Sequence, residues 1–107
     1  MFVFSVPPRV WVDSQLVGAP LDHDLQVECF IEASPRSITY WLKTGQTTPL
    51  MTGSGQVVEE ERVGYKTVYR LRISRFSSRD AGTYKCVSEN SLGRDEVTIR
   101  IYGEETF

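Results

Sequence analysis

Two cysteines and a tryptophan constrain the fold of this chain more than any other feature. Cys29 and Cys86 are the only cysteines among 107 residues, and Trp41 follows the first by twelve positions. The run 80–86, Asp-Ala-Gly-Thr-Tyr-Lys-Cys, places Tyr84 two residues before the second cysteine. This spacing suits a sandwich in which a tryptophan packs against an inter-sheet bridge and a tyrosine closes a corner. The pattern predicts an all-β sandwich of two antiparallel sheets joined by one disulfide.

The cysteine pair also bears on the compartment in which the chain works. Two cysteines with none left over favour a structural disulfide, and closing the span 29–86 stabilises a fold by about 4 kcal/mol in the chain-entropy model. Such bridges persist in oxidising compartments. A reduced, cytosolic pair of buried thiols is the alternative that the residues leave open, because free cysteine is a common interior residue.

Length and charge limit the domain count and the classes of partner. A chain of 107 residues is long enough for one core. We predict a domain at 7–102, after a remnant of a preceding domain or linker at 1–6 and before a linker at 103–107. The net charge of −2 with both signs interleaved does not favour nucleic acid or an anionic membrane. The apolar start lacks basic residues and stops at two prolines, unlike a signal peptide or membrane span.

The apolar pattern predicts short strands and no helix of useful length. Expected strands span residues 9–12, 15–19, 25–31, 38–43, 57–62, 66–74, 83–89 and 95–102. The second should continue the first after a kink. Residues 43–55, rich in Thr, Gly and Ser, should form turns around one or two short edge strands. Residues 90–93, Asn-Ser-Leu-Gly, should turn the last hairpin with left-handed backbone.

A core signature accompanies the cysteines. The alternation of the strands directs Trp41 and Leu71 inward. Asp80 and Gly82 belong to the motif that ends on Cys86. The hydroxyl of Tyr84 should bond to a backbone carbonyl between residues 78 and 80.

Catalytic and metal-binding patterns are weak in this chain. The only histidine, His23, lies in a polar turn, and no nucleophile has a base beside it in the pattern, so we predict neither an enzyme nor a cofactor. A solvated loop histidine is the expected role, and a weak metal site with Asp22 and Asp24 is the alternative. The distant cysteines do not form a zinc knuckle. The Glu59–Glu61 run should be a solvated edge rather than a cation site.

Four arginines could form a stripe that binds a sulfated glycan: Arg70, Arg72, Arg75 and Arg79. Two of them should share an outer sheet face. Glu28 and the Glu59–Glu61 run should lie near the stripe. We therefore expect these carboxylates to neutralise it.

The outer faces of the sheets are the remaining candidates for binding. On the sheet of Trp41, the outward residues should be Tyr40, Leu42, Lys85, Val87, Thr98 and Arg100. The three apolar members could form a small centre with a charged rim, as in a modest protein interface. The alternative is that exposed apolar residues are scattered on any surface. On the other sheet, Phe30 should be an isolated outward aromatic and Trp11 should be covered by its own chain.

Further pieces of the chain carry a resemblance to a known family. The cysteine–tryptophan pattern, Pro35, the strand 71–73, the run 80–86 and the turn 90–93 resemble I-set immunoglobulin domains. More narrowly, segments 6–8, 15–19, 32–41 and 64–66 are similar to the third immunoglobulin domain of insect lachesin and the Dpr-interacting proteins, relatives of the IgLON group. The resemblance runs from about Pro7 to Tyr102.

This resemblance implies an immunoglobulin-like β-sandwich from a neuronal cell-surface receptor of three such domains, often lipid-anchored. In these receptors the first domain contacts partners on apposed cells, and the third lies nearest the membrane. It implies a Cys29–Cys86 bridge packed against Trp41. The outer face of the Trp41 sheet corresponds to the face that the first domain uses, which does not make it a binding site here. The sole asparagine, Asn90, is not a glycosylation acceptor, unlike those of many extracellular relatives.

The function predicted from the sequence is a non-catalytic extracellular module of a cell-surface adhesion or recognition receptor. We expect a membrane-proximal spacer that is monomeric in isolation, with other cell-surface proteins as partners of other domains of its parent. We expect no nucleic-acid partner and no direct membrane insertion. An intracellular muscle-type structural domain with reduced thiols and a ligand-binding receptor domain are the alternatives.

Overall fold

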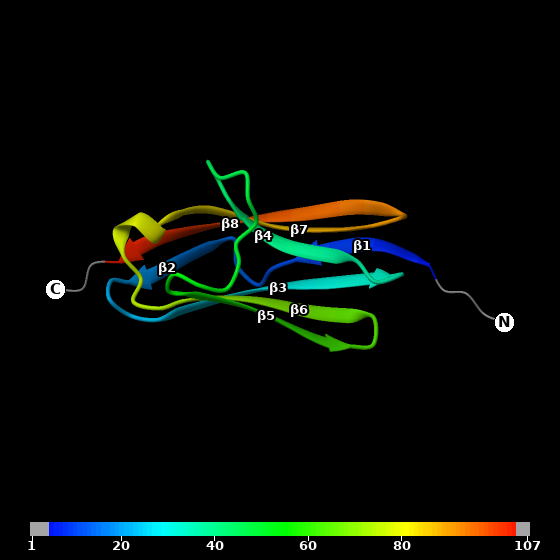
Figure 1. Ribbon diagram of the computed structural model, residues 1–107, viewed down its shortest axis with the longest axis horizontal. Coiled ribbons are helices and arrows are strands. Elements are labelled where there is room, and N and C mark those ends of the chain that lie inside the picture. Colours follow the sequence, from blue (N-terminus) through cyan, green and yellow to red (C-terminus); the bar gives the residue numbers. More distant parts are fainter. Residues whose placement is uncertain (1–4, 105–107) are drawn as a thin grey trace.

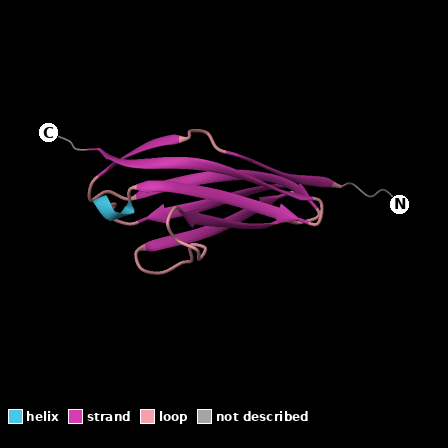
Figure 2. Cartoon of the chain, turned by 90° about the horizontal axis from the view of Figure 1, so that it is seen from above, coloured by secondary structure: helices cyan, strands magenta, loops and turns pink. Residues whose placement is uncertain are grey.

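Two four-stranded sheets pack face to face in a computed structural model that describes residues 5–104 (Figures 1 and 2). The first sheet has the order β1-β3-β6-β5, and the second sheet has the order β2-β8-β7-β4. The elements are β1 (Val6–Trp11), β2 (Leu16–Pro20), β3 (Leu25–Ser34), β4 (Ile38–Lys43), β5 (Gln56–Val63), β6 (Lys66–Ile73), the 3-10 helix η1 (Ser78–Asp80), β7 (Gly82–Asn90) and β8 (Gly93–Glu104). The predicted immunoglobulin-like sandwich is confirmed.

The core lies between the sheets and follows the alternation of the strands. On β3, Val27, Cys29 and Ile31 are buried, while the intervening residues face outward or are more exposed. Leu71 and Trp41 are fully buried on the facing sheets. Because neighbouring residues of a strand point to opposite faces, one apolar set per strand is enough to build this core.

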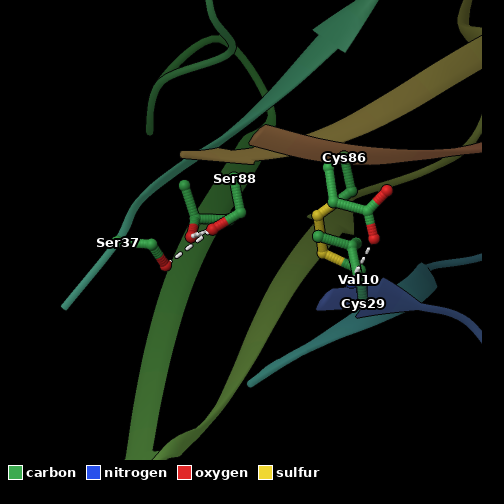
Figure 3. Close-up of a disulfide and its surroundings, with 7 residues drawn as sticks. Val10, Cys29, Ser37, Cys86 and Ser88 are labelled. Carbon is green, nitrogen blue, oxygen red and sulfur yellow. Dashed lines mark hydrogen bonds between the residues drawn. A yellow bond between two sulfur atoms is a disulfide. The ribbon is translucent and has the colours of Figure 1, made fainter. Parts of the chain in front are cut away.

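A disulfide between Cys29 on β3 and Cys86 on β7 joins the two sheets, as predicted (Figure 3). The two Cα atoms are 6.5 Å apart although 57 positions separate the residues. Trp41 is the register partner of Cys86, which places the indole in the core next to the bridge. Its Nε1 is buried and has no hydrogen-bond partner among residues 5–104, so the indole contributes by packing.

The first two strands differ from the prediction. β1 begins at Val6 rather than residue 9 and ends at Trp11, and its register with β3 shifts between Val6 and Arg9. This shift coincides with two prolines, which cannot donate to a ladder. β2 does not continue β1 in the same sheet: it crosses to the second sheet and runs parallel to β8, with Val17 opposite Ile101. The second sheet is therefore not purely antiparallel.

No edge strand forms between Lys43 and Gly55, contrary to the prediction. Leu50 N donates to Trp41 O at 2.8 Å, and an isolated bridge pairs Gly53 with Gln56. Three glycines with positive φ, at 45, 53 and 55, interrupt the extended backbone. By contrast, β5 and β6 match their predicted spans to within one residue.

The last hairpin forms as predicted, but its turn has different backbone geometry. None of residues 90–93 belongs to the described residues with positive φ, so no left-handed backbone is used. Instead the Asn90 side chain holds the turn, because its Oδ1 accepts from Leu92 N at 2.8 Å. Its Nδ2 donates to Pro35 O at 2.9 Å and to Val6 O at 3.2 Å. One amide thus ties three segments together at this end of the sandwich.

None of the helices described between residues 5 and 104 has the length and hydropathy needed to cross a membrane.

Candidate interaction face

The six residues predicted on the outer side of the second sheet do share one face. We call this surface the outer face of the second sheet. The register across β4, β7 and β8 aligns Tyr40 with Val87, and Leu42 with Lys85 and Thr98. Arg100 lies opposite Thr83 on β7 and opposite Leu16 on β2. The sequence pattern therefore located the members correctly, and whether they bind a partner stays a prediction.

Val87 is a correction to the predicted apolar centre. Its side chain is 0% exposed, so it offers no contact area to a partner. Tyr40 and Glu96 flank it in register on the neighbouring strands, and both have longer side chains. Of the three apolar residues predicted for this centre, Tyr40 and Leu42, both partly buried, remain accessible.

Glu96 is a member of this face that the sequence reasoning missed. Its Oε2 lies 3.7 Å from Lys85 Nζ and 3.5 Å from Arg94 Nη2. The alternation of β8 could have identified it, since Glu96, Thr98 and Arg100 follow at intervals of two. The carboxylate offsets the basic rim, so the face carries mixed charge rather than a field of one sign. Three exposed apolar residues of this face were also missed: Leu16, 60% exposed opposite Arg100, Ile38, 70% exposed on β4, and Tyr102, 41% exposed on β8.

A shallow hollow of about 230 Å³ borders this face at the end of β4. Leu42, Lys43 and Lys85 line it together with residues 44–46. Lys43 Nζ also lies 5.6 Å from the centre of the Tyr84 ring and donates to Arg79 O at 2.6 Å. The hollow is therefore bounded by cations, one of which already has partners within the chain.

The predicted tyrosine corner is confirmed and belongs to the scaffold of the face. Tyr84 Oη donates to Asp80 O at 2.5 Å, and the ring is 3% exposed. Burial, and to a lesser degree the Asp80 carboxylate, raises the pKa of Tyr84 to about 12. Asp80 in turn accepts from Ser77 N at 2.9 Å, a bond that caps η1 just before the start of β7.

The outer side of the first sheet shows a second group of contacts. Trp11 stacks on Phe30 with ring centres 5.9 Å apart, and the Arg9 guanidinium lies 5.8 Å from the Trp11 ring centre. Trp11 is covered by its own chain, as predicted. Phe30 is not isolated, contrary to the prediction, because β1 and β3 bring the two aromatic residues opposite each other.

The acidic residues neutralise part of the arginine stripe, as predicted. Arg70 lies 2.7 Å from Glu28 and 3.3 Å from Glu61, and hydrogen bonds to these two carboxylates raise its pKa. Arg72 lies 3.3 Å from Glu59. Glu60, on the alternate face of β5, pairs with Arg62 at 2.8 Å. The other two arginines of the predicted stripe, Arg75 and Arg79, lie outside this network.

Two hydrogen bonds from the backbone of residues 75 and 76 hold the turn that contains His23. His23 O accepts from Phe76 N at 2.8 Å, and Asp24 Oδ1 accepts from Arg75 N at 3.0 Å. His23, Asp22 and Asp24 are all exposed. Within the described residues no three His, Cys, Asp or Glu side chains are grouped as metal ligands.

Together the disulfide, the buried Trp41 and the Tyr84 corner define a sandwich domain of the immunoglobulin type. The chain belongs to the immunoglobulin I-set family, whose model, described as the immunoglobulin I-set domain, matches residues 8–102.

Relatives and solved structures place the chain near cell-adhesion proteins. Hemicentin-2 of Mus musculus is 33% identical over 91% of this chain, and lachesin of Schistocerca americana is 28% identical over 87%. A crystal structure of Dpr2 Ig1–Ig2 in complex with DIP-Theta Ig1–Ig3 contains a chain that is 40% identical over 94% of this one, with a TM-score of 0.87. The resemblance to lachesin and the Dpr-interacting proteins is thus confirmed.

Proteins of muscle also match. The muscle M-line assembly protein unc-89 of Caenorhabditis elegans is 28% identical over 81% of this chain. This chain spans 2% of hemicentin-2, 27% of lachesin, 1% of unc-89 and 33% of the chain in the Dpr2 complex. The relatives are much longer, and the similarity concerns one domain of each.

Proposed function

We propose that this chain is a non-catalytic, extracellular immunoglobulin module of a cell-surface adhesion or recognition receptor of neuronal type. The observation that carries the proposal is the 40% identity, at a TM-score of 0.87, to a chain of the Dpr2–DIP-Theta complex. The disulfide supports it, since such bridges form and persist outside the reducing cytosol. We propose no cofactor, metal or nucleic-acid partner for this module.

Within such a receptor, the module acts as a membrane-proximal spacer. The outer face of the second sheet supports this role, because Val87 at its centre is buried and the exposed Leu16 and Ile38 lie on the two edge strands, β2 and β4. Lys85 and Glu96, which are charged, lie on β7 and β8 between these edges. A stable protein interface requires a larger buried area with an apolar centre. Partners on other cells then bind through other domains of the parent protein. In this proposal residues 7–102 form the domain and the flanking segments are linkers. A lipid anchor attaches the parent protein to the membrane.

Sedimentation velocity of the isolated chain across a concentration series tests the spacer role. We expect a monomer at micromolar concentration for the wild type and for Leu42→Arg, which adds a charge to the outer face beside Lys85. Val63→Arg is the matched control, because Val63 is 74% exposed on the first sheet. A wild-type dimer that Leu42→Arg abolishes and Val63→Arg preserves would show that this face is an interface and contradict the spacer role.

The alternative, an intracellular structural module like those of muscle, has the similarity to unc-89 in its favour. It differs from the proposed function in one measurable property, the oxidation state of Cys29 and Cys86. Reduced thiols in the natural protein would favour the muscle-type role.

A further inference from the structure

A polar hollow of about 580 Å³ is lined by residues of the end of β6, the start of β5 and η1. These three parts of the chain lie at the same end of the sandwich (Figure 1). Its volume is within the range of known small-molecule sites. The side chains that line it include two arginines and three serines: Arg75, Arg79, Ser54, Ser74 and Ser77. All of these can donate hydrogen bonds, and the arginines carry permanent positive charge.

The arginines of this hollow differ from the two that face outward on β6. Arg70 and Arg72 form ion pairs with carboxylates of β3 and β5. Neither Arg75 nor Arg79 has a carboxylate within 4.0 Å among residues 5–104. Their guanidinium groups are therefore available to an anion from outside the chain.

The backbone of this segment is fixed by contacts that do not involve the two guanidinium groups. Arg75 has a φ of 52°, a left-handed conformation that is uncommon for a residue with a side chain. Its N–H donates to Asp24 Oδ1 at 3.0 Å, and the next residue, Phe76, is fully buried. The carbonyl of Arg79 accepts from Lys43 Nζ at 2.6 Å. Strained conformations that are held in this way are concentrated at binding sites.

The donor set also indicates the chemistry of the ligand. Among residues 5–104, Asp80 is the only acidic residue that lines the hollow, and its Oδ2 accepts from both Ser77 N and Ser77 Oγ. With two arginines and one aspartate, the lining has a net charge of +1. Arginine pairs with oxyanions through parallel hydrogen bonds, and the hydroxyls of Ser54 and Ser74 add neutral donors, whereas the Ser77 hydroxyl already donates to Asp80. Sulfate and phosphate esters both present the oxygens that such a set recognises.

We propose that this hollow binds a sulfate ester of an acidic polysaccharide. A single tetrahedral anion occupies a small part of 580 Å³, which leaves space for the sugar that carries it. The choice of sulfate over a phosphorylated protein rests on the extracellular location proposed above. Outside the cell, sulfated polysaccharides are the abundant carriers of ester oxyanions.

Isothermal titration with a heparin-derived octasaccharide tests this site in the purified chain. Arg75→Gln/Arg79→Gln removes both guanidinium groups and keeps the backbone bonds to Asp24 and Lys43. We expect binding to weaken by about tenfold or more. Arg36→Gln/Arg62→Gln removes the same charge at two exposed positions outside the hollow and should change the dissociation constant by less than about twofold. No binding by the wild type, or equal weakening in both variants, would overturn the proposal.

Two further probes distinguish the ligand class. The desulfated octasaccharide should not bind measurably, and a phosphoserine peptide should bind more weakly than the sulfated sugar. A phosphopeptide that binds more tightly, and only to chains with Arg75 and Arg79, would show that the ligand class is wrong.

Amide chemical-shift mapping on the wild type keeps the test informative if the double variant fails to fold. We expect perturbations from the sulfated octasaccharide to centre on residues 54–56 and 73–80, and perturbations centred elsewhere would overturn the site. These outcomes are separable from those of the proposed function. Reduced thiols in the natural protein contradict the extracellular role without affecting binding in vitro, and absence of binding leaves the adhesion role intact.

Discussion

Tyr84 connects the end of η1 to the second sheet through one hydrogen bond, from its hydroxyl to Asp80 O at 2.5 Å. The ring is nearly inaccessible to water, so a carbonyl that loses this donor is left without a partner in a partly buried place. We expect Tyr84→Phe to lower the free energy of unfolding by on the order of 1 to 3 kcal/mol. Urea denaturation followed by circular dichroism measures this, and an unchanged midpoint would show that the corner contributes nothing.

The raised pKa of Tyr84 predicts a loss of stability in alkali. Its folded-state pKa of about 12 exceeds the ordinary value of about 10, so the folded chain holds the proton more tightly than the unfolded chain. The corresponding stability is fully present below pH of about 10 and is lost as pH rises towards about 12. Urea midpoints of wild type and Tyr84→Phe should therefore converge over this window. A difference that stays constant from pH 8 to pH 12 would contradict the prediction.

For single residues, the sequence predicts which side of a sheet a side chain lies on better than it predicts how exposed that side chain is. The alternation of β7 correctly places Cys86 inward and Val87 on the opposite side. Exposure also depends on neighbours that are distant in sequence: Val87 lies between Tyr40 of β4 and Glu96 of β8 and is buried. The same limitation explains Phe30, whose stacking partner Trp11 comes from another strand. Short-range periodicity contains no information about these neighbours.

At the scale of elements, one side chain links the edge of the first sheet to the second. Asp95 on β8 accepts from Val10 N on β1 at 2.7 Å, beside the disulfide (Figure 3). We expect Asp95→Ala to lower the free energy of unfolding by roughly 1 to 3 kcal/mol, because the bond is charge-assisted and partly buried. Hydrogen exchange of the Val10 amide should become faster than in wild type.

Asp13→Ala is the matched control for this link. Asp13 is exposed and has no ion pair or side-chain hydrogen bond among residues 5–104. Its replacement should change neither the unfolding free energy nor the exchange of Val10 appreciably. Equal exchange of Val10 in wild type and Asp95→Ala would show that the two strands are held together by other contacts.

Strand existence is predictable from this sequence, while the choice of sheet is not. The strands β3 to β8 appear where apolar alternation places them, because each buries one face. The crossing of β2 to the second sheet depends on its pairing with β8, more than 80 positions later, which no local pattern encodes. The segment after Lys43 shows the converse: a plausible edge strand is absent, because glycines with positive φ interrupt the backbone there.

At the scale of the whole molecule, the sandwich separates three surfaces of different character. The outer face of the second sheet has a charged centre and exposed apolar residues on its two edge strands. The outer side of the first sheet carries ion pairs and an aromatic stack, and one end of the sandwich carries the hollow with two arginines that have no ion pair among residues 5–104. The sequence indicated the arginines but not their division between these surfaces. Arg70 and Arg72 lie on β6, which ends at Ile73, whereas Arg75 and Arg79 follow it, after the backbone turns at Arg75 with a φ of 52°.

The central claim, an extracellular domain held by a Cys29–Cys86 bridge, is tested most directly by counting free thiols in the protein from the cells that naturally make it. Cell lysis in excess iodoacetamide with denaturant and no reductant, followed by mass spectrometry, reports alkylation at both cysteines. The account predicts no alkylation before reduction and two labelled cysteines after it. Two labelled cysteines without reduction would contradict the extracellular account and favour the muscle-type alternative.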